Sequence, residues 1–135
     1  MLLDGINHVA LISGDVDKLG SFYREVFEAE VGPTTPHGDD GGETMTVIRI
    51  GPHTELNVFT IEGNDQADRQ TPMWGRGRLD HLGLQAASRD AFETIRGRLV
   101  EHGASDGAVN DFGGVLSMFF RDPDGLEGEV LIPTG

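Results

Sequence analysis

The chain has 135 residues, a formal net charge of −13 and no cysteine. This length suits one well-buried core rather than two ordinary domains, and the lack of cysteine excludes disulfides, thiolate metal ligands and cysteine nucleophiles. The acidic charge disfavours binding to nucleic acid. No apolar run reaches the ~20 residues of a membrane span, and the N-terminus has no signal-peptide pattern. We therefore expect a cytoplasmic protein without nucleic-acid or membrane partners.

The first half of the chain is predicted to contain strands, one helix and one loop. A mostly buried strand covers residues 5–12, and either Asp15 or Asp17 can cap a helix that runs to about residue 28. Residues 32–43 are rich in glycine and proline, which predicts a loop. Two strands complete this half, over residues 44–50 and 55–61.

The second half is predicted to follow the same order after a polar connector over residues 63–78. A strand over 79–84 leads to a helix with Ser88 as its N-cap and Gly103 just beyond its end. A loop, a strand, a tight Asp-Pro-Asp-Gly turn and a last strand follow, over residues 107–114, 115–120, 122–125 and 127–132. The connector holds the single tryptophan, Trp74, which we interpret as a packing residue in preference to a platform for a substrate ring.

Two histidines and two glutamates recur at nearly the same spacing in the two halves. His8 lies in the segment Asn-His-Val-Ala-Leu near the start of the first half, and His81 lies in the similar segment Asp-His-Leu-Gly-Leu near the start of the second. The interval from His8 to Glu55 is nearly equal to the interval from His81 to Glu129. A duplicated unit that contributes one imidazole and one carboxylate per copy can build a metal site with two histidines and two glutamates.

The two predicted helices support the duplication. When the first half is shifted along the chain until His8 falls on His81, four apolar positions of one helix fall on apolar positions of the other, at the spacing of one helical face. The pairs are Leu19 with Phe92, Phe22 with Ile95, Val26 with Leu99, and Phe27 with Val100. We therefore predict an α+β fold made of a β-α-β-β-β unit used twice.

The glutamates predict metal binding because strand side chains alternate between faces. A carboxylate that faces a sheet interior is costly unless it binds a partner, and a divalent metal is such a partner. Two neutral imidazoles and two carboxylates form an uncharged site with M²⁺, which suits Ni, Zn, Co, Fe or Mn. From the residues alone, Glu127 competes with Glu129 because both share a face, and His53 competes with Glu55.

Several of these segments together resemble the vicinal oxygen chelate superfamily, which includes glyoxalase I, bleomycin resistance proteins and extradiol dioxygenases. The resemblance covers essentially the whole chain and is carried by the two histidine segments, Phe22-Tyr23 on the first helix, and the Asp-Pro-Asp-Gly turn followed by Glu129. It implies one glyoxalase-like domain over residues 1–135, with one module over about 1–62 and another over about 78–135. These modules would form a cupped mixed sheet around a metal site, usually completed in a homodimer.

Carried over by position, the resemblance implies that the metal ligands are His8, Glu55, His81 and Glu129. This His/Glu/His/Glu pattern is most similar to glyoxalase I. It implies a metal-dependent isomerase or lyase that acts on a small substrate with adjacent oxygens through an enediolate, with Glu129 or Glu55 as the catalytic group that moves the proton. The alternatives are a non-catalytic small-molecule (antibiotic) binding resistance protein and an Fe(II) extradiol dioxygenase.

Overall fold

The computed structural model describes residues 1–66 and 74–135 of the chain. The fold divides into two compact units, residues 1–68 and 69–135. Among the described residues, each unit contains one helix and one sheet of four strands, and the two sheets have the equivalent strand orders β1-β4-β3-β2 and β5-β8-β7-β6. The α+β class and the repeated β-α-β-β-β unit predicted from the sequence are therefore confirmed.

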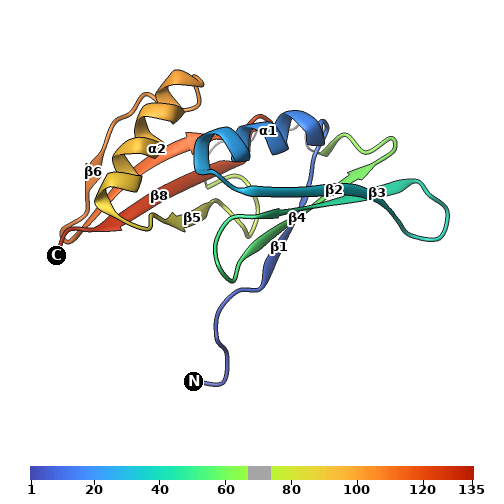
Figure 1. Cartoon of the computed structure of the whole chain (residues 1–135), viewed down its shortest axis with the longest axis horizontal. Coiled ribbons are helices and arrows are strands. Elements are labelled where there is room, and N and C mark those ends of the chain that lie inside the picture. Colours follow the sequence, from blue (N-terminus) through green and yellow to red (C-terminus); the bar gives the residue numbers. More distant parts are fainter. Residues whose placement is uncertain (67–73) are drawn as a thin grey trace. The chain divides into compact units, whose positions relative to one another are not determined.

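The first unit consists of elements that all lie before residue 62 (Figure 1). They are β1 (His8–Ile12), α1 (Val16–Phe27), β2 (Glu30–His37), β3 (Glu43–Arg49) and β4 (Glu55–Ile61). Strand β1 pairs with β4 in parallel, whereas β3 pairs with both β4 and β2 in antiparallel fashion. Helix α1 connects the edge strand β1 to the opposite edge strand β2 and packs on the sheet.

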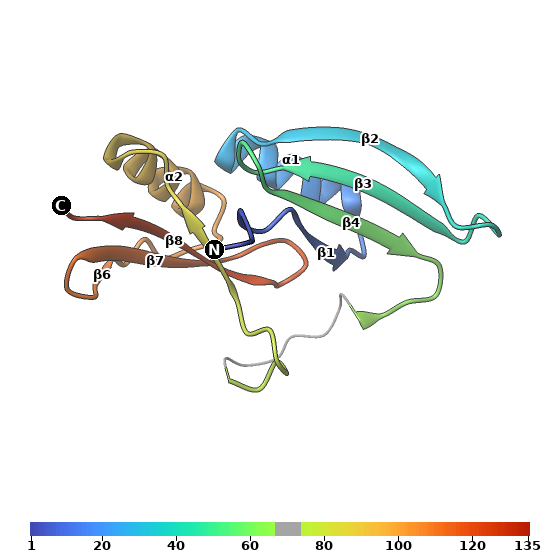
Figure 2. The same cartoon turned by 90° about the horizontal axis from the view of Figure 1, so that it is seen from below.

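The second unit repeats this arrangement with shorter outer strands (Figure 2). Its elements are β5 (Leu82–Gln85), α2 (Arg89–Glu101), β6 (Asn110–Asp111), β7 (Val115–Arg121) and β8 (Glu127–Pro133). Strand β5 pairs with β8 in parallel, and β7 pairs with both β8 and β6 in antiparallel fashion. None of the helices in the described residues is long and apolar enough to cross a membrane.

The core of each unit lies between its helix and one face of its sheet. The helix-facing side chains of the first unit are fully buried or nearly so, and they include Leu19 and Val26 from α1 and Leu56 and Val58 from β4. The core of the second unit is built in the same way, from the buried side chains of Phe92 and Leu99 on α2 and of Met118 and Val130 on the sheet. The opposite face of each sheet, which we call the open face, is therefore left for other groups.

Helix capping agrees with the sequence patterns. Asp15, rather than Asp17, is the N-cap of α1, and its carboxylate accepts a 3.0 Å hydrogen bond from the Lys18 backbone N–H. Ser88 caps α2 through a 3.0 Å hydrogen bond from the Ala91 N–H. Gly103 follows the end of α2 with φ = +68°, a left-handed conformation that favours glycine.

The predicted loop over residues 32–43 was wrong for most of its length, because β2 continues to His37. Two prolines argued against a strand, since proline has no N–H to donate to a ladder. However, β2 is the edge strand of its sheet, where a missing donor can face outward, and its pairing with β3 is irregular between Val31 and Thr34. The short strand β6 likewise lies inside the predicted loop 107–114.

Candidate functional site

The first histidine–glutamate pair is formed by neighbouring parallel strands. His8 and Glu55 are direct partners in the β1–β4 ladder and lie on the open face of the first sheet. Nδ1 of His8 lies 2.8 Å from Oδ1 of Asn7, so this ring nitrogen is occupied and Nε2 is left for another partner. The Glu55 side chain is 32% exposed, and its Oε1 lies 3.6 Å from Nη2 of Arg49.

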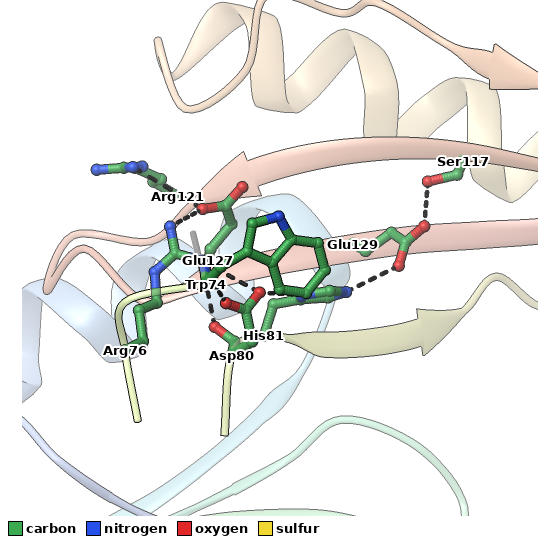
Figure 3. A network of polar contacts seen from close by, with 8 residues as sticks. All are labelled: Trp74, Arg76, Asp80, His81, Ser117, Arg121, Glu127 and Glu129. Atoms are coloured by element: carbon green, nitrogen blue, oxygen red, sulfur yellow. Dashed lines mark hydrogen bonds and ion pairs between the residues drawn. The ribbon is translucent and has the colours of Figure 1, made fainter. Parts of the chain in front are cut away.

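The second pair is closer and more enclosed (Figure 3). Nε2 of His81 lies 3.3 Å from Oε2 of Glu129, whose side chain is only 11% exposed. The Ser117 hydroxyl donates a hydrogen bond to the other carboxylate oxygen of Glu129. Nδ1 of His81 is 2.6 Å from Oδ1 of Asp80, and the ring meets Phe119 edge-to-face at a centroid distance of 5.6 Å. In both halves of the chain, Nδ1 of the histidine therefore lies next to the side chain of the preceding residue.

Glu127 and Glu129 differ in their side-chain contacts. Both lie on the open face, as strand alternation predicted. The Glu127 carboxylate is already engaged, since it accepts from the Arg76 guanidinium and lies 3.8 Å from Nη2 of Arg121. Glu129 contacts His81 instead. Among the residues that precede β4, His53 is exposed and lies in the bend before Glu55, where it lines a cavity of about 440 Å³ together with Asn7, Arg49 and Glu55.

The donor atoms of both pairs fit a divalent cation. Each pair offers an imidazole whose Nδ1 is occupied and a carboxylate on the same open face. In the first unit, Oδ1 of Asn57 also lies on this face, hidden from solvent and without a hydrogen-bond partner among the described residues. Among the described residues, no three His, Asp or Glu side chains gather closely enough to hold a metal ion.

The His81–Asp80 contact changes the pKa of both groups. The hydrogen bond to Asp80 raises the pKa of His81 above its ordinary value, with the Glu129 carboxylate adding to this and burial opposing it. The same hydrogen bond, followed by the one from the Trp74 backbone N–H, lowers the pKa of Asp80. In the metal-free chain, this pair therefore favours a protonated imidazole beside an ionised carboxylate.

We expect this pair to stabilise the metal-free fold most between about pH 4 and about pH 6.5. The contribution of His81 is fully present below its unfolded pKa of about 6.5 and is lost as pH rises through its higher folded pKa. That of Asp80 is present above about pH 3.9 and is lost as pH falls through its lower folded pKa. In urea unfolding of the metal-free chain, the stability difference between wild type and Asp80→Asn should shrink from pH 6 to pH 9. A constant difference would contradict the assignment.

Sequence reasoning missed two residues of the second site. Asp80 and Ser117 contact His81 and Glu129, yet neither was assigned a role. Arg76 was considered only as one of several arginines that could contact an anion, and it contacts Glu127. Asp80 had a usable signal, because it precedes His81 as Asn7 precedes His8. The packing interpretation of Trp74 was wrong, since this residue is 81% exposed.

Comparisons with known proteins agree with the fold. Residues 5–130 match the model of the Glyoxalase/Bleomycin resistance protein/Dioxygenase superfamily. A 2-epi-5-epi-valiolone epimerase from Actinomyces sp. is 28% identical, over 96% of this chain and 80% of its own length. A glyoxylase/bleomycin resistance protein/dioxygenase domain from Frankia sp. EAN1pec has a similar structure, with a TM-score of 0.81 and 21% identity over 97% of this chain and 98% of that one. A fosfomycin resistance protein, FosX, from Listeria monocytogenes, complexed with Mn(II) and a dihydroxypropylphosphonic acid, has a TM-score of 0.69 and 19% identity over 99% and 94% of the two chains.

Proposed function

Because the chain belongs to the Glyoxalase/Bleomycin resistance protein/Dioxygenase superfamily, we propose that it is a metal-dependent isomerase or lyase acting on a small substrate with adjacent oxygens. The observation that carries this proposal is the duplicated histidine–glutamate pair. In each copy the histidine presents Nε2 and the glutamate lies on the same open face. We assign His8, Glu55, His81 and Glu129 together as the ligands of one divalent metal ion.

The ligand chemistry narrows the choice of metal without fixing it. Imidazole nitrogens and carboxylate oxygens suit Ni, Zn, Co, Fe or Mn, whereas soft metals prefer the sulfur ligands that a chain without cysteine cannot offer as thiolates. The structural neighbour FosX is complexed with Mn(II). A metal ion held here would act as a Lewis acid on the two substrate oxygens.

The two glutamates differ in how firmly they are held, which suggests separate roles. Glu129 is enclosed and is held from both sides by Ser117 and His81, as a fixed ligand requires. Glu55 is more exposed, and its ion pair with Arg49 is long, at 3.6 Å. We therefore assign Glu55 as the better candidate to accept and return the proton next to the substrate carbonyl, with Glu129 as the anchor.

One relative supports proton transfer in particular. The curated relative is an epimerase, and an epimerase inverts one stereocentre of its substrate. Removing and returning a proton next to a carbonyl achieves such an inversion with the same groups that an isomerase of the glyoxalase type needs. By its name the relative acts on 2-epi-5-epi-valiolone, and we extend to this chain only the class of a small molecule with adjacent oxygens.

A second candidate is a non-catalytic protein that binds and sequesters a small molecule. One observation favours it, because the indole of Trp74 is exposed and could stack on an aromatic ligand. The paired histidines and glutamates argue against it, since a binder of this kind has no need for metal ligands. Metal content separates these candidates, and Fe(II) as the native metal would instead favour a dioxygenase.

The metal site is tested by elemental analysis and calorimetry. Protein purified without added metal should contain close to one Ni, Zn, Co, Fe or Mn ion per four-residue set. His81→Ala should lower the affinity for the metal by roughly tenfold or more, because an imidazole ligand is lost. His53→Ala is the matched control and should leave the affinity unchanged. Equal affinities of wild type and His81→Ala would refute the assigned ligand set.

We also propose that the chain forms a homodimer. Four large apolar side chains near the N-terminus are exposed, and burying them would favour association. They are Met1, Leu2, Leu3 and Ile6. Repulsion between two chains of charge −13 opposes dimerisation, so the contact should be apolar at its centre and only slightly weaker at low salt. Size exclusion with light scattering should give a dimer mass at micromolar concentration, and a monomer mass throughout that range would contradict the proposal.

A further inference from the structure

The carboxylate of Asp80 is surrounded by donors beyond His81. Its Oδ2 accepts a 2.7 Å hydrogen bond from the backbone N–H of Trp74. Its Oδ1 lies 3.3 Å from Nη1 of Arg76 and 2.6 Å from Nδ1 of His81. Figure 3 shows that these contacts gather around the start of β5. Asp80 therefore has little freedom to turn away from the imidazole.

Arg76 connects Asp80 to strand β8. One side of its guanidinium bonds Asp80, and the other donates to the Glu127 carboxylate on β8. The side chains of Arg76 and Glu127 are each only 11% exposed, so solvent screens this contact less than a surface ion pair. The strand that carries Glu129 is thereby tied to the residue that holds His81.

The first unit lacks this charged support at the equivalent position. Asn7 presents a neutral amide oxygen to Nδ1 of His8, at 2.8 Å, and both residues are exposed. A hydrogen bond to an ionised acceptor is stronger than one to a neutral acceptor. The two halves of the repeat therefore orient their histidines with unequal strength.

We propose that Asp80 and Arg76 are positioning residues for His81. When the His81 ring is neutral, Asp80 holds the proton on Nδ1 and so presents the lone pair of Nε2 to the side of Glu129, while Arg76 and Glu127 keep Asp80 in place. The value of this arrangement for metal binding rests on the proposed function. The ring orientation itself is a property of the metal-free chain and can be measured separately.

The test combines nitrogen NMR with calorimetry. In metal-free wild type, at a pH where the ring is neutral, ¹⁵N imidazole spectra should show His81 with its proton on Nδ1. Asp80→Ala should give a mixture of the two tautomers and lower the affinity for Zn or Ni about 10–100-fold. Asp80→Asn retains an acceptor, as Asn7 does in the first unit, so it should restore most of the Nδ1–H form. Circular dichroism of each variant establishes that it folds.

The outcomes separate this inference from the proposed function. If Asp80→Ala keeps both the Nδ1–H form and the wild-type affinity, the positioning role is wrong even though the metal binds. If the tautomer changes as expected but wild type binds no metal, the positioning role stands and the metal site fails. Arg76→Met should produce a smaller loss of the Nδ1–H form than Asp80→Ala, because it loosens the acceptor without removing it. A loss as large as that of Asp80→Ala would assign the orientation to Arg76 instead.

Discussion

Glu129→Gln is expected to weaken binding of a divalent metal by more than about a hundredfold, because the loss of a direct ligand should exceed the 10–100-fold cost of removing an outer partner. An amide oxygen can still accept from Ser117, so the strand should keep its position. Calorimetric titration of the metal-free chain with Zn or Ni measures the change.

Glu127→Gln is the matched control, on the same strand and the same open face. It should lower metal affinity far less than Glu129→Gln, because it only loosens the support of Asp80, and it should lower stability by removing the charge that partners the enclosed guanidinium of Arg76. If Glu127→Gln were the variant that loses the metal, Glu127 would replace Glu129 in the ligand set and Arg76 would need another partner.

Gly128→Ala is expected to have the largest effect on stability, about 1–3 kcal/mol. A Cβ at this position would lie 2.2 Å from Cζ of Phe120, in the buried space between the second sheet and its helix. The ring would have to leave its place, and a close-packed interior has little room for it. Denaturant unfolding of the two proteins gives the difference.

Two variants make this result specific. Gly83→Ala, on the neighbouring strand, would bring its Cβ to 3.1 Å from the end of the flexible Leu131 side chain, so a much smaller loss is expected. The double variant Gly128→Ala with Phe120→Leu replaces the ring with a smaller side chain. It should recover part of the lost stability, since the two changes affect the same space. Purely additive losses would show that the clash is not the cause.

The sequence predicted the elements whose signals are local. The turn before β8 is an example, because Asp122 accepts hydrogen bonds from the N–H groups of Asp124 and Leu126, both at 3.0 Å, and Gly125 has φ = +83°. These interactions join near neighbours in the chain and therefore appear in the residue pattern itself. The N-caps at Asp15 and Ser88 were predictable for the same reason.

Features that depend on the place of a strand in the sheet were not predictable in this way. Pro33 and Pro36 signal a loop locally, but the edge position of β2 makes them acceptable in a strand. Nothing in the sequence states that this strand will have a neighbour on one side only. The pairing partner decides the outcome, and a local residue pattern does not reveal that partner.

The same difference between signals within the residue pattern and long-range contacts applies to the candidate site. The repeat identified both histidine–glutamate pairs, because each copy places its histidine at or just before the start of one strand and its glutamate in the parallel neighbour of that strand. The contact of Arg76 with Glu127 could not be found in this way, since it links a connector to β8 across 51 residues. A long-range contact made once in the chain leaves no repeat to detect. The joint four-residue metal site stays a prediction.

Because β1 pairs with β4 in parallel, the strands that carry the site must keep their register, whereas a loop outside this ladder can change its length. His8 and Glu55 meet through that ladder alone, whereas the tip that joins β2 to β3, over residues 38–42, lies outside it. Lengthening an exposed tip costs little, because the entropy of closing a loop grows only slowly with its length. New residues can therefore be inserted at that tip, as an attachment point for a label, while the spacing of the imidazole and the carboxylate is preserved.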